Sequence, residues 1–130
     1  VNKPVHMGET GWATVSNEHY GNDGSKATDE YKSAKYYGLM REWANKAGIT
    51  CFYFEAFDEN WKNSANPLHS ENHFGFIDLQ SHAKFAIWNL VDEGAFKGLK
   101  RNGKAITKSY NGNEQLLWGD VVTPDKILKN

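Results

Sequence analysis

The 130-residue sequence contains one cysteine, Cys51, and therefore cannot form a disulfide within the chain. Because Cys51 lies inside an apolar stretch, we interpret it as a small buried residue and not as a nucleophile. Basic and acidic residues nearly balance, 15 against 16, and no lysine-rich stripe is present, which argues against a nucleic-acid partner. No apolar run approaches the roughly 20 residues of a membrane span, so we expect no membrane association.

No signal peptide is visible, and the chain begins with Val1 instead of methionine. We therefore expect a cleaved product or a piece of a longer protein. The length suits one small domain and is far short of the roughly 250 residues of a complete eight-unit α/β barrel. Aromatic residues, in contrast, are plentiful, with five Trp, six Tyr and seven Phe. A rich core accounts for part of them, and the remainder suit a carbohydrate cleft.

The stretch from Ile49 to Lys62 organises the chain. It begins with β-branched and aromatic residues, typical of a strand buried on both faces, and ends in charged and aromatic ones. Alternation places Glu55 on the same face as Cys51 and Tyr53. Burying an unpaired carboxylate there would be costly, whereas parallel α/β folds build active sites at the carboxyl ends of their strands. We therefore predict an active-site edge at Glu55.

The residues before this stretch predict a strand and a helix. Residues 2–12 indicate a short strand that enters a polar turn, and Thr28 is the expected N-cap of the helix that follows. The helix is expected to end at Gly48 in a left-handed cap. Its predicted core-facing stripe consists of Tyr36, Met40, Trp43 and Ala47. Strand, helix and strand together predict a right-handed βαβ crossover.

Two further elements are expected beyond Lys62. After a long irregular loop, a second helix is predicted from about Ser81 to Val91, giving the order β, α, β, α. Residues 94–130 differ in character and indicate a hairpin with its turn at Asn111-Gly112. We accordingly divide the chain into residues 1–93 and an extension, residues 94–130.

Three segments in this order resemble motifs of glycoside hydrolase family 17, the β-1,3-glucanases and related transglycosylases. They are HMGETGW at residues 6–12, FYFEAFDENWK at residues 52–62, and SENHFGFID at residues 70–78. The resemblance spans about residues 2–92. It implies the C-terminal βαβα portion of a (β/α)8 TIM barrel, to which the extension adds a β-hairpin.

The resemblance also implies site residues. Glu9 matches the nucleophile of a retaining enzyme, in which two carboxyl groups stand about 5–5.5 Å apart and a glycosyl-enzyme forms. The family's general acid belongs to a strand that this chain does not contain, and Asn17-Glu18 follows the wrong strand to replace it. Five further residues match the polar surroundings or the cleft wall: Glu59, Lys62, Glu71, Trp12 and Phe57. The resemblance implies no cofactor, a β-1,3-glucan ligand, and a secreted or periplasmic location.

Several roles remain open from the residues themselves. Glu55 could contact substrate or hold Lys62, and Lys62 could form a surface ion pair with Glu59 or lower the pKa of a carboxyl group. The alternating His69, Glu71 and His73 have the spacing of strand-borne metal ligands but lack a fourth, which favours hydrogen bonding to sugar or backbone. Trp12 and Trp61 suit stacking against sugar rings. Trp118, in the extension, suits packing within the hairpin.

Three functional hypotheses follow. The first is the C-terminal part of a retaining β-1,3-glucan hydrolase or transglycosylase, which requires a complementary barrel chain or a homo-oligomer. The second is a non-catalytic, self-associating module that binds glucan. The third is a structural relic that dimerises without a ligand. Two open sheet edges, which must be paired or covered, underlie the expectation of a partner.

Overall fold

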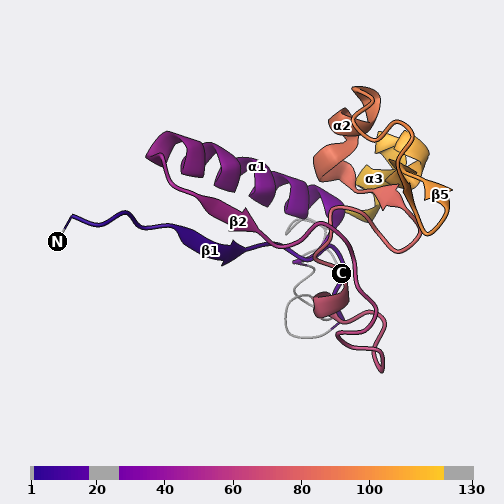
Figure 1. Ribbon diagram of the computed structural model, residues 1–130. Helices are drawn as coiled ribbons and strands as arrows, with labels where there is room; N and C mark the ends of the chain where they lie inside the picture. Colours follow the sequence, from indigo (N-terminus) through magenta and orange to yellow (C-terminus); the bar gives the residue numbers. More distant parts are fainter. Residues whose placement is uncertain (1, 18–26, 122–130) are drawn as a thin grey trace.

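A computed structural model describes residues 2–17 and 27–121 of the chain. Strands β1 (Met7–Thr10) and β2 (Cys51–Tyr53) pair in parallel, and helix α1 (Glu30–Ala47), which connects them, lies alongside the pair (Figure 1). Met7 is opposite Cys51 and Thr10 is opposite Tyr53, with an irregularity in register between them. The predicted order of strand, helix and parallel strand is confirmed.

Helix α1 begins one residue later than expected. Its N-cap is Asp29, whose carboxylate accepts a hydrogen bond from the Lys32 amide, and not Thr28. A carboxylate at this position also interacts favourably with the positive end of the helix dipole. The predicted end is confirmed, because Gly48 has φ of 64° and its amide bonds the carbonyls of the last turn.

The predicted burial of α1 and β2 is partly wrong. The buried positions of α1 are Ser33 and Ala44, while Trp43 of the expected stripe is 48% exposed. On β2, which was expected to be buried on both faces, Phe52 is 63% exposed. The reason is that β2 pairs with β1 alone within the described residues, so this narrow sheet covers only part of α1. Tyr36 does face the sheet, with its ring 6.4 Å from that of Tyr53.

The second predicted helix is mostly replaced by other elements. After the short 3₁₀ helix η1 (Ser70–Asn72), the chain forms strand β3 (His82–Ala83), 3₁₀ helix η2 (Phe85–Ile87) and helix α2 (Trp88–Asp92). Ser81 has φ of 74°, which a right-handed helix does not allow. Residues 82–83 instead pair in parallel with strand β6 (Thr107–Lys108).

The extension contains a hairpin, but not at the predicted turn. Strands β4 (Lys100–Arg101) and β5 (Lys104–Ala105) pair antiparallel across Asn102-Gly103, where both φ values are positive. Asn111-Gly112 instead lies in 3₁₀ helix η3 (Ser109–Gly112), and helix α3 (Glu114–Asp120) follows. The turn prediction is wrong because the next residue, Asn113, caps α3 with its side chain. Trp118 lies on α3, not in a hairpin, with its ring 4.6 Å from that of Tyr31.

Two apolar clusters join the extension to the rest of the chain. One contains the buried residues Ile77, Ala83 and Ile87, with Phe96 and Ile106 packed against them. The other is centred on the buried residues Trp88, Leu117 and Val121, with Tyr31, Phe85 and Tyr110 around them. The extension therefore packs directly against the segment that contains β3, η2 and α2. No helix in residues 2–17 and 27–121 is long and apolar enough to cross a membrane.

Candidate functional site

Three predicted site residues meet just beyond the carboxyl end of β2. The Nζ atom of Lys62 lies 3.0 Å from Oε1 of Glu55 and 3.4 Å from Oε2 of Glu59. The Lys62 and Glu55 side chains are only 15% and 16% exposed. Glu55 therefore holds Lys62 in this structure, which was one of the two roles considered for it.

The charges of this cluster do not cancel, since one ammonium group faces two carboxylates. Burial raises the pKa of Glu55, and the hydrogen bond and charge of Lys62 only partly oppose that effect. Burial acts to lower the pKa of Lys62, but hydrogen bonds and attraction from Glu55 and Glu59 raise it overall. The Lys62 side chain consequently remains protonated and positively charged at neutral pH.

Two aromatic rings lie near the same ammonium group. Nζ of Lys62 lies 3.9 Å from the centroid of the Phe54 ring and 6.0 Å from that of Trp61. Trp61 is 70% exposed, and Phe57, a predicted wall residue, is 44% exposed. The cluster thus combines charged hydrogen-bonding groups with open ring faces.

Glu9 lies on the neighbouring strand at the same end of the sheet. It is the third residue of β1 and is exposed. The amide of Phe54, which follows β2, bonds the carbonyl of Thr10 at 2.7 Å. Beside it, a Cβ atom on Gly11 would stand 2.1 Å from the Phe54 carbonyl oxygen, so only glycine fits this crossing. The ends of β1 and β2 therefore bring the segments of Glu9 and Glu55 together.

Two other predicted residues, Trp12 and Glu71, make their recorded contacts with groups outside the Lys62 cluster. The indole nitrogen of Trp12 donates to the Ala27 carbonyl at 3.0 Å, and its ring packs 5.1 Å from that of Tyr36. Trp12 also borders a separate apolar cavity of about 300 Å³. Glu71 is exposed on η1, where its amide bonds Nδ1 of His69.

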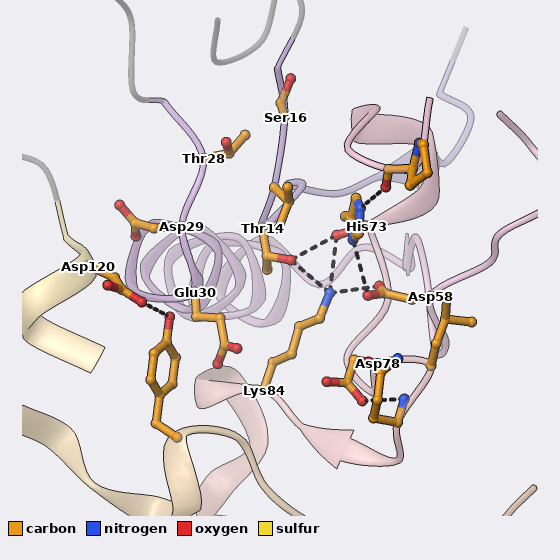
Figure 2. A pocket seen from close by; sticks show the side chains of 15 residues that line it. Thr14, Ser16, Thr28, Asp29, Glu30, Asp58, His73, Asp78, Lys84 and Asp120 are labelled. Atoms are coloured by element: carbon orange, nitrogen blue, oxygen red, sulfur yellow. Dashed lines mark hydrogen bonds and ion pairs between the residues drawn. The ribbon is translucent and has the colours of Figure 1, made fainter. Parts of the chain in front are cut away.

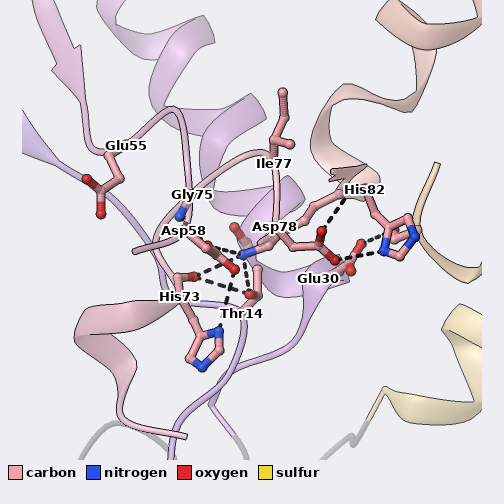
Figure 3. Close-up of polar contacts among 12 residues, drawn as sticks. Thr14, Glu30, Glu55, Asp58, His73, Gly75, Ile77, Asp78 and His82 are labelled. Atoms are coloured by element: carbon pink, nitrogen blue, oxygen red, sulfur yellow. Dashed lines mark hydrogen bonds and ion pairs between the residues drawn. The ribbon is translucent and has the colours of Figure 1, made fainter. Parts of the chain in front are cut away.

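A buried network beneath these loops was missed by the sequence reasoning (Figure 3). Nζ of Lys84 lies 2.7 Å from Oδ1 of Asp58 and also bonds Oγ1 of Thr14 at 2.8 Å. The Gly75 amide donates to the same Asp58 oxygen, while Nδ1 of His73 lies 3.5 Å from the other one. Burial lowers the pKa of Lys84, and attraction to Asp58 opposes this shift. The polar run after β2 contains Asp58, but nothing local marks Lys84, which lies 26 residues away.

A cavity of about 620 Å³ opens beside this network (Figure 2). Its lining includes Lys84 and His73 but neither Glu9 nor any residue of the Lys62 cluster. At its edge, Oε2 of Glu30 accepts hydrogen bonds from the Phe85 amide and the Ser109 hydroxyl. Burial raises the pKa of Glu30, and these bonds only partly counter it. Across the described residues, no group of three or more His, Cys, Asp and Glu side chains could hold a metal ion.

Carboxylates, an ammonium group and exposed aromatic rings at the carboxyl end of parallel strands are typical of a site that binds neutral, polyhydroxylated ligands. Charged side chains form strong hydrogen bonds with hydroxyl groups, and ring faces pack against the apolar faces of sugars. The site therefore has the chemistry of a carbohydrate-binding site.

Comparisons with known proteins point in the same direction. The chain is 33% identical over 88 residues to a glucan 1,3-beta-glucosidase of Arthroderma benhamiae, and 33% identical over 90 residues to one of Saccharomyces cerevisiae. Each match covers 62% of this chain but only 27% and 25% of the relatives. The crystal structure of an endo-laminarinase from Formosa Hel1_33_131 superposes with a TM-score of 0.92 and 56% identity over 95% of this chain. No family model matches the chain.

These matches confirm the resemblance to β-1,3-glucan-active glycoside hydrolases that the three sequence motifs indicated. The chain has the fold of part of a glycoside hydrolase, since it corresponds to 32% of the laminarinase chain. It spans about a quarter of the length of the curated relatives.

Proposed function

We propose that this chain is the C-terminal portion of a retaining glycoside hydrolase or transglycosylase that acts on β-1,3-glucan, with Glu9 as nucleophile. The observation that carries the proposal is the parallel pairing of β1 with β2, which puts Glu9 and Glu55 at the same end of the sheet. The similarity to an endo-laminarinase and to glucan 1,3-beta-glucosidases supports the choice of ligand.

In this proposal Glu9 attacks the anomeric carbon, and the glycosyl-enzyme is released to water or to an acceptor sugar. Lys62, held by Glu55 and Glu59, donates hydrogen bonds to sugar hydroxyls and balances negative charge near the nucleophile. Trp61, Phe57 and Trp12 supply sugar-facing rings, and Glu71 lines the outer part of the cleft. The acid that protonates the leaving group comes from outside this chain.

The acid is supplied by a complementary barrel chain, and either that chain or a homo-oligomer covers the open edges of β1 and β2. Edge strands with free backbone groups pair readily with further strands. A secreted or periplasmic location fits a polymeric substrate. A non-catalytic, self-associating module that binds glucan is the second candidate, because the ring faces and Lys62 suffice for binding without an acid.

Native mass spectrometry of the purified protein, followed by a laminarin cleavage assay, separates the two candidates. A second polypeptide that accompanies the chain, together with cleavage that Glu9→Gln abolishes, supports the enzyme. Glu93→Gln, which changes an exposed carboxylate at the C-cap of α2, is the matched control and should cleave like the wild type. Chains of 130 residues alone, which bind laminarin oligosaccharides without cleaving them, favour the module.

A further inference from the structure

Arg101, on strand β4 of the extension, reaches back to the loop of the candidate site. Its Nη1 atom donates to the carbonyl oxygens of Ile77 and Asp78 at 3.0 and 2.7 Å. Its Nη2 atom donates to the carbonyl of Asp58 at 2.7 Å. One guanidinium group therefore ties together two segments, at Asp78 and Asp58, that lie 23 and 43 residues away in the sequence.

The same guanidinium group also lies over an aromatic ring. The Cζ atom of Arg101 is 4.7 Å from the centroid of the Phe57 ring, within the range of a cation–π contact. Phe57 is 44% exposed and stands two residues before Glu59. The ring is thus supported by a fixed planar cation while a large part of its surface stays open.

Arg101 is itself held in place. The buried hydroxyl of Ser81 donates to the Arg101 carbonyl at 2.8 Å. The segments it bonds are also joined directly, because the Asp58 amide donates to the Ile77 carbonyl at 2.8 Å. A lysine could replace the charge but not the planar fork that bonds three carbonyls and stacks on the ring.

We propose that Arg101 is a positioning residue, which fixes the Phe57 ring as a platform for one sugar ring of the glucan. The identity of this ligand rests on the proposed function. The extension then belongs to the ligand site and is not merely an appended element. Arg101 touches no substrate in this scheme and acts through Phe57.

A double-mutant cycle tests this role by isothermal titration with laminarin hexasaccharide. Arg101→Gln and Phe57→Ala should each weaken binding by about tenfold. The double variant should be no weaker than Phe57→Ala alone, because both changes remove the same platform. Lys100→Gln, which removes the neighbouring charge on β4, should bind like the wild type. Additive losses, or full affinity in Arg101→Gln, would overturn the inference.

A second measurement keeps the inference separate from the choice of ligand. 4-Fluorophenylalanine at position 57 should show a changed ¹⁹F chemical shift in Arg101→Gln and in Arg101→Lys, but not in Lys100→Gln. Arg101→Lys also serves as the variant if Arg101→Gln does not fold. If the wild type binds no oligosaccharide, the proposed function fails. Independently of that result, a ¹⁹F chemical shift that is the same in the wild type and in the Arg101 variants would refute the positioning role.

Discussion

Asp58 and Lys84 form a buried ion pair, with 2.7 Å between Oδ1 and Nζ and with exposures of only 2% and 5%. The pair connects the loop that carries Glu59 and Lys62 to the segment that precedes η2. Every polar group of Asp58 is engaged, since its amide bonds Ile77 and its carbonyl accepts from Arg101. The Asp58 residue thus anchors the loop of the candidate site from within the core.

Replacing Lys84 should be strongly destabilising. Lys84→Met leaves the Asp58 carboxylate buried without its cation, which costs about 3–5 kcal/mol. Lys108→Met is the control, because Lys108 pairs with Asp92, whose side chain is 62% exposed, and such surface pairs contribute about 0–1 kcal/mol. Urea unfolding of both variants measures the difference. Equal losses would show that the buried pair does not anchor the fold.

Gly75 should tolerate no side chain. A Cβ atom there would lie 2.0 Å from the Asp58 amide nitrogen and 2.2 Å from the Phe57 carbonyl carbon. Both neighbours are backbone atoms, so Gly75→Ala should reduce the free energy of unfolding by about 1–3 kcal/mol or more.

Gly38→Ala is the matched control for Gly75→Ala. Gly38 lies inside α1, and an added Cβ would meet nothing within 4 Å. Alanine should stabilise this helix by about 1 kcal/mol relative to glycine. Thermal melts of the two variants should therefore shift in opposite directions. A shift in the same direction would contradict the close crossing of residues 57–58 and 75.

Glu30 should make stability depend on pH. Burial raises its pKa above 4.5 in the folded chain, so the folded state holds this proton more tightly than the unfolded state. Its contribution to stability is complete below pH 4.5 and is lost as the pH rises through the raised pKa. The free energy of unfolding of the wild type, relative to Glu30→Gln, should therefore fall as the pH rises above 4.5.

Urea titrations across this range measure the difference. Glu42→Gln, an exposed position on α1, controls for the loss of one negative charge. A constant difference between the wild type and Glu30→Gln at every pH would contradict the prediction.

Local signals in the sequence explain which elements could be predicted. The N-terminal charge of α1, its Gly48 cap and the apolar run of β2 are each encoded within a few residues. The helix predicted from Ser81 failed because the apolar spacing of Phe85 and Trp88 also suits a 3₁₀ turn followed by a single short helix. Pairing with β6, more than 20 residues away, determined the outcome there.

In the candidate site, too, residues that are close in sequence could be predicted and residues that are distant in sequence could not. Glu55, Glu59 and Lys62 are close in sequence, so their cluster at the strand end could be expected from the pattern of β2. Lys84 and Arg101 could not be found in this way, because they reach Asp58 across 26 and 43 residues. No periodicity or motif connects positions so far apart. Their roles follow from packing alone.

Trapping of the glycosyl-enzyme tests the proposed role of Glu9 most directly. A 2-deoxy-2-fluoro laminaribiosyl fluoride carries a leaving group that departs without a general acid, so the reaction depends on the nucleophile and the sugar site. Intact mass spectrometry should show one added glycosyl group, and peptide mapping should locate it on Glu9. Glu9→Gln should remain unmodified. An adduct on Glu55 or another carboxylate, or no adduct on protein that binds laminarin oligosaccharides, would contradict the assignment of Glu9 as nucleophile.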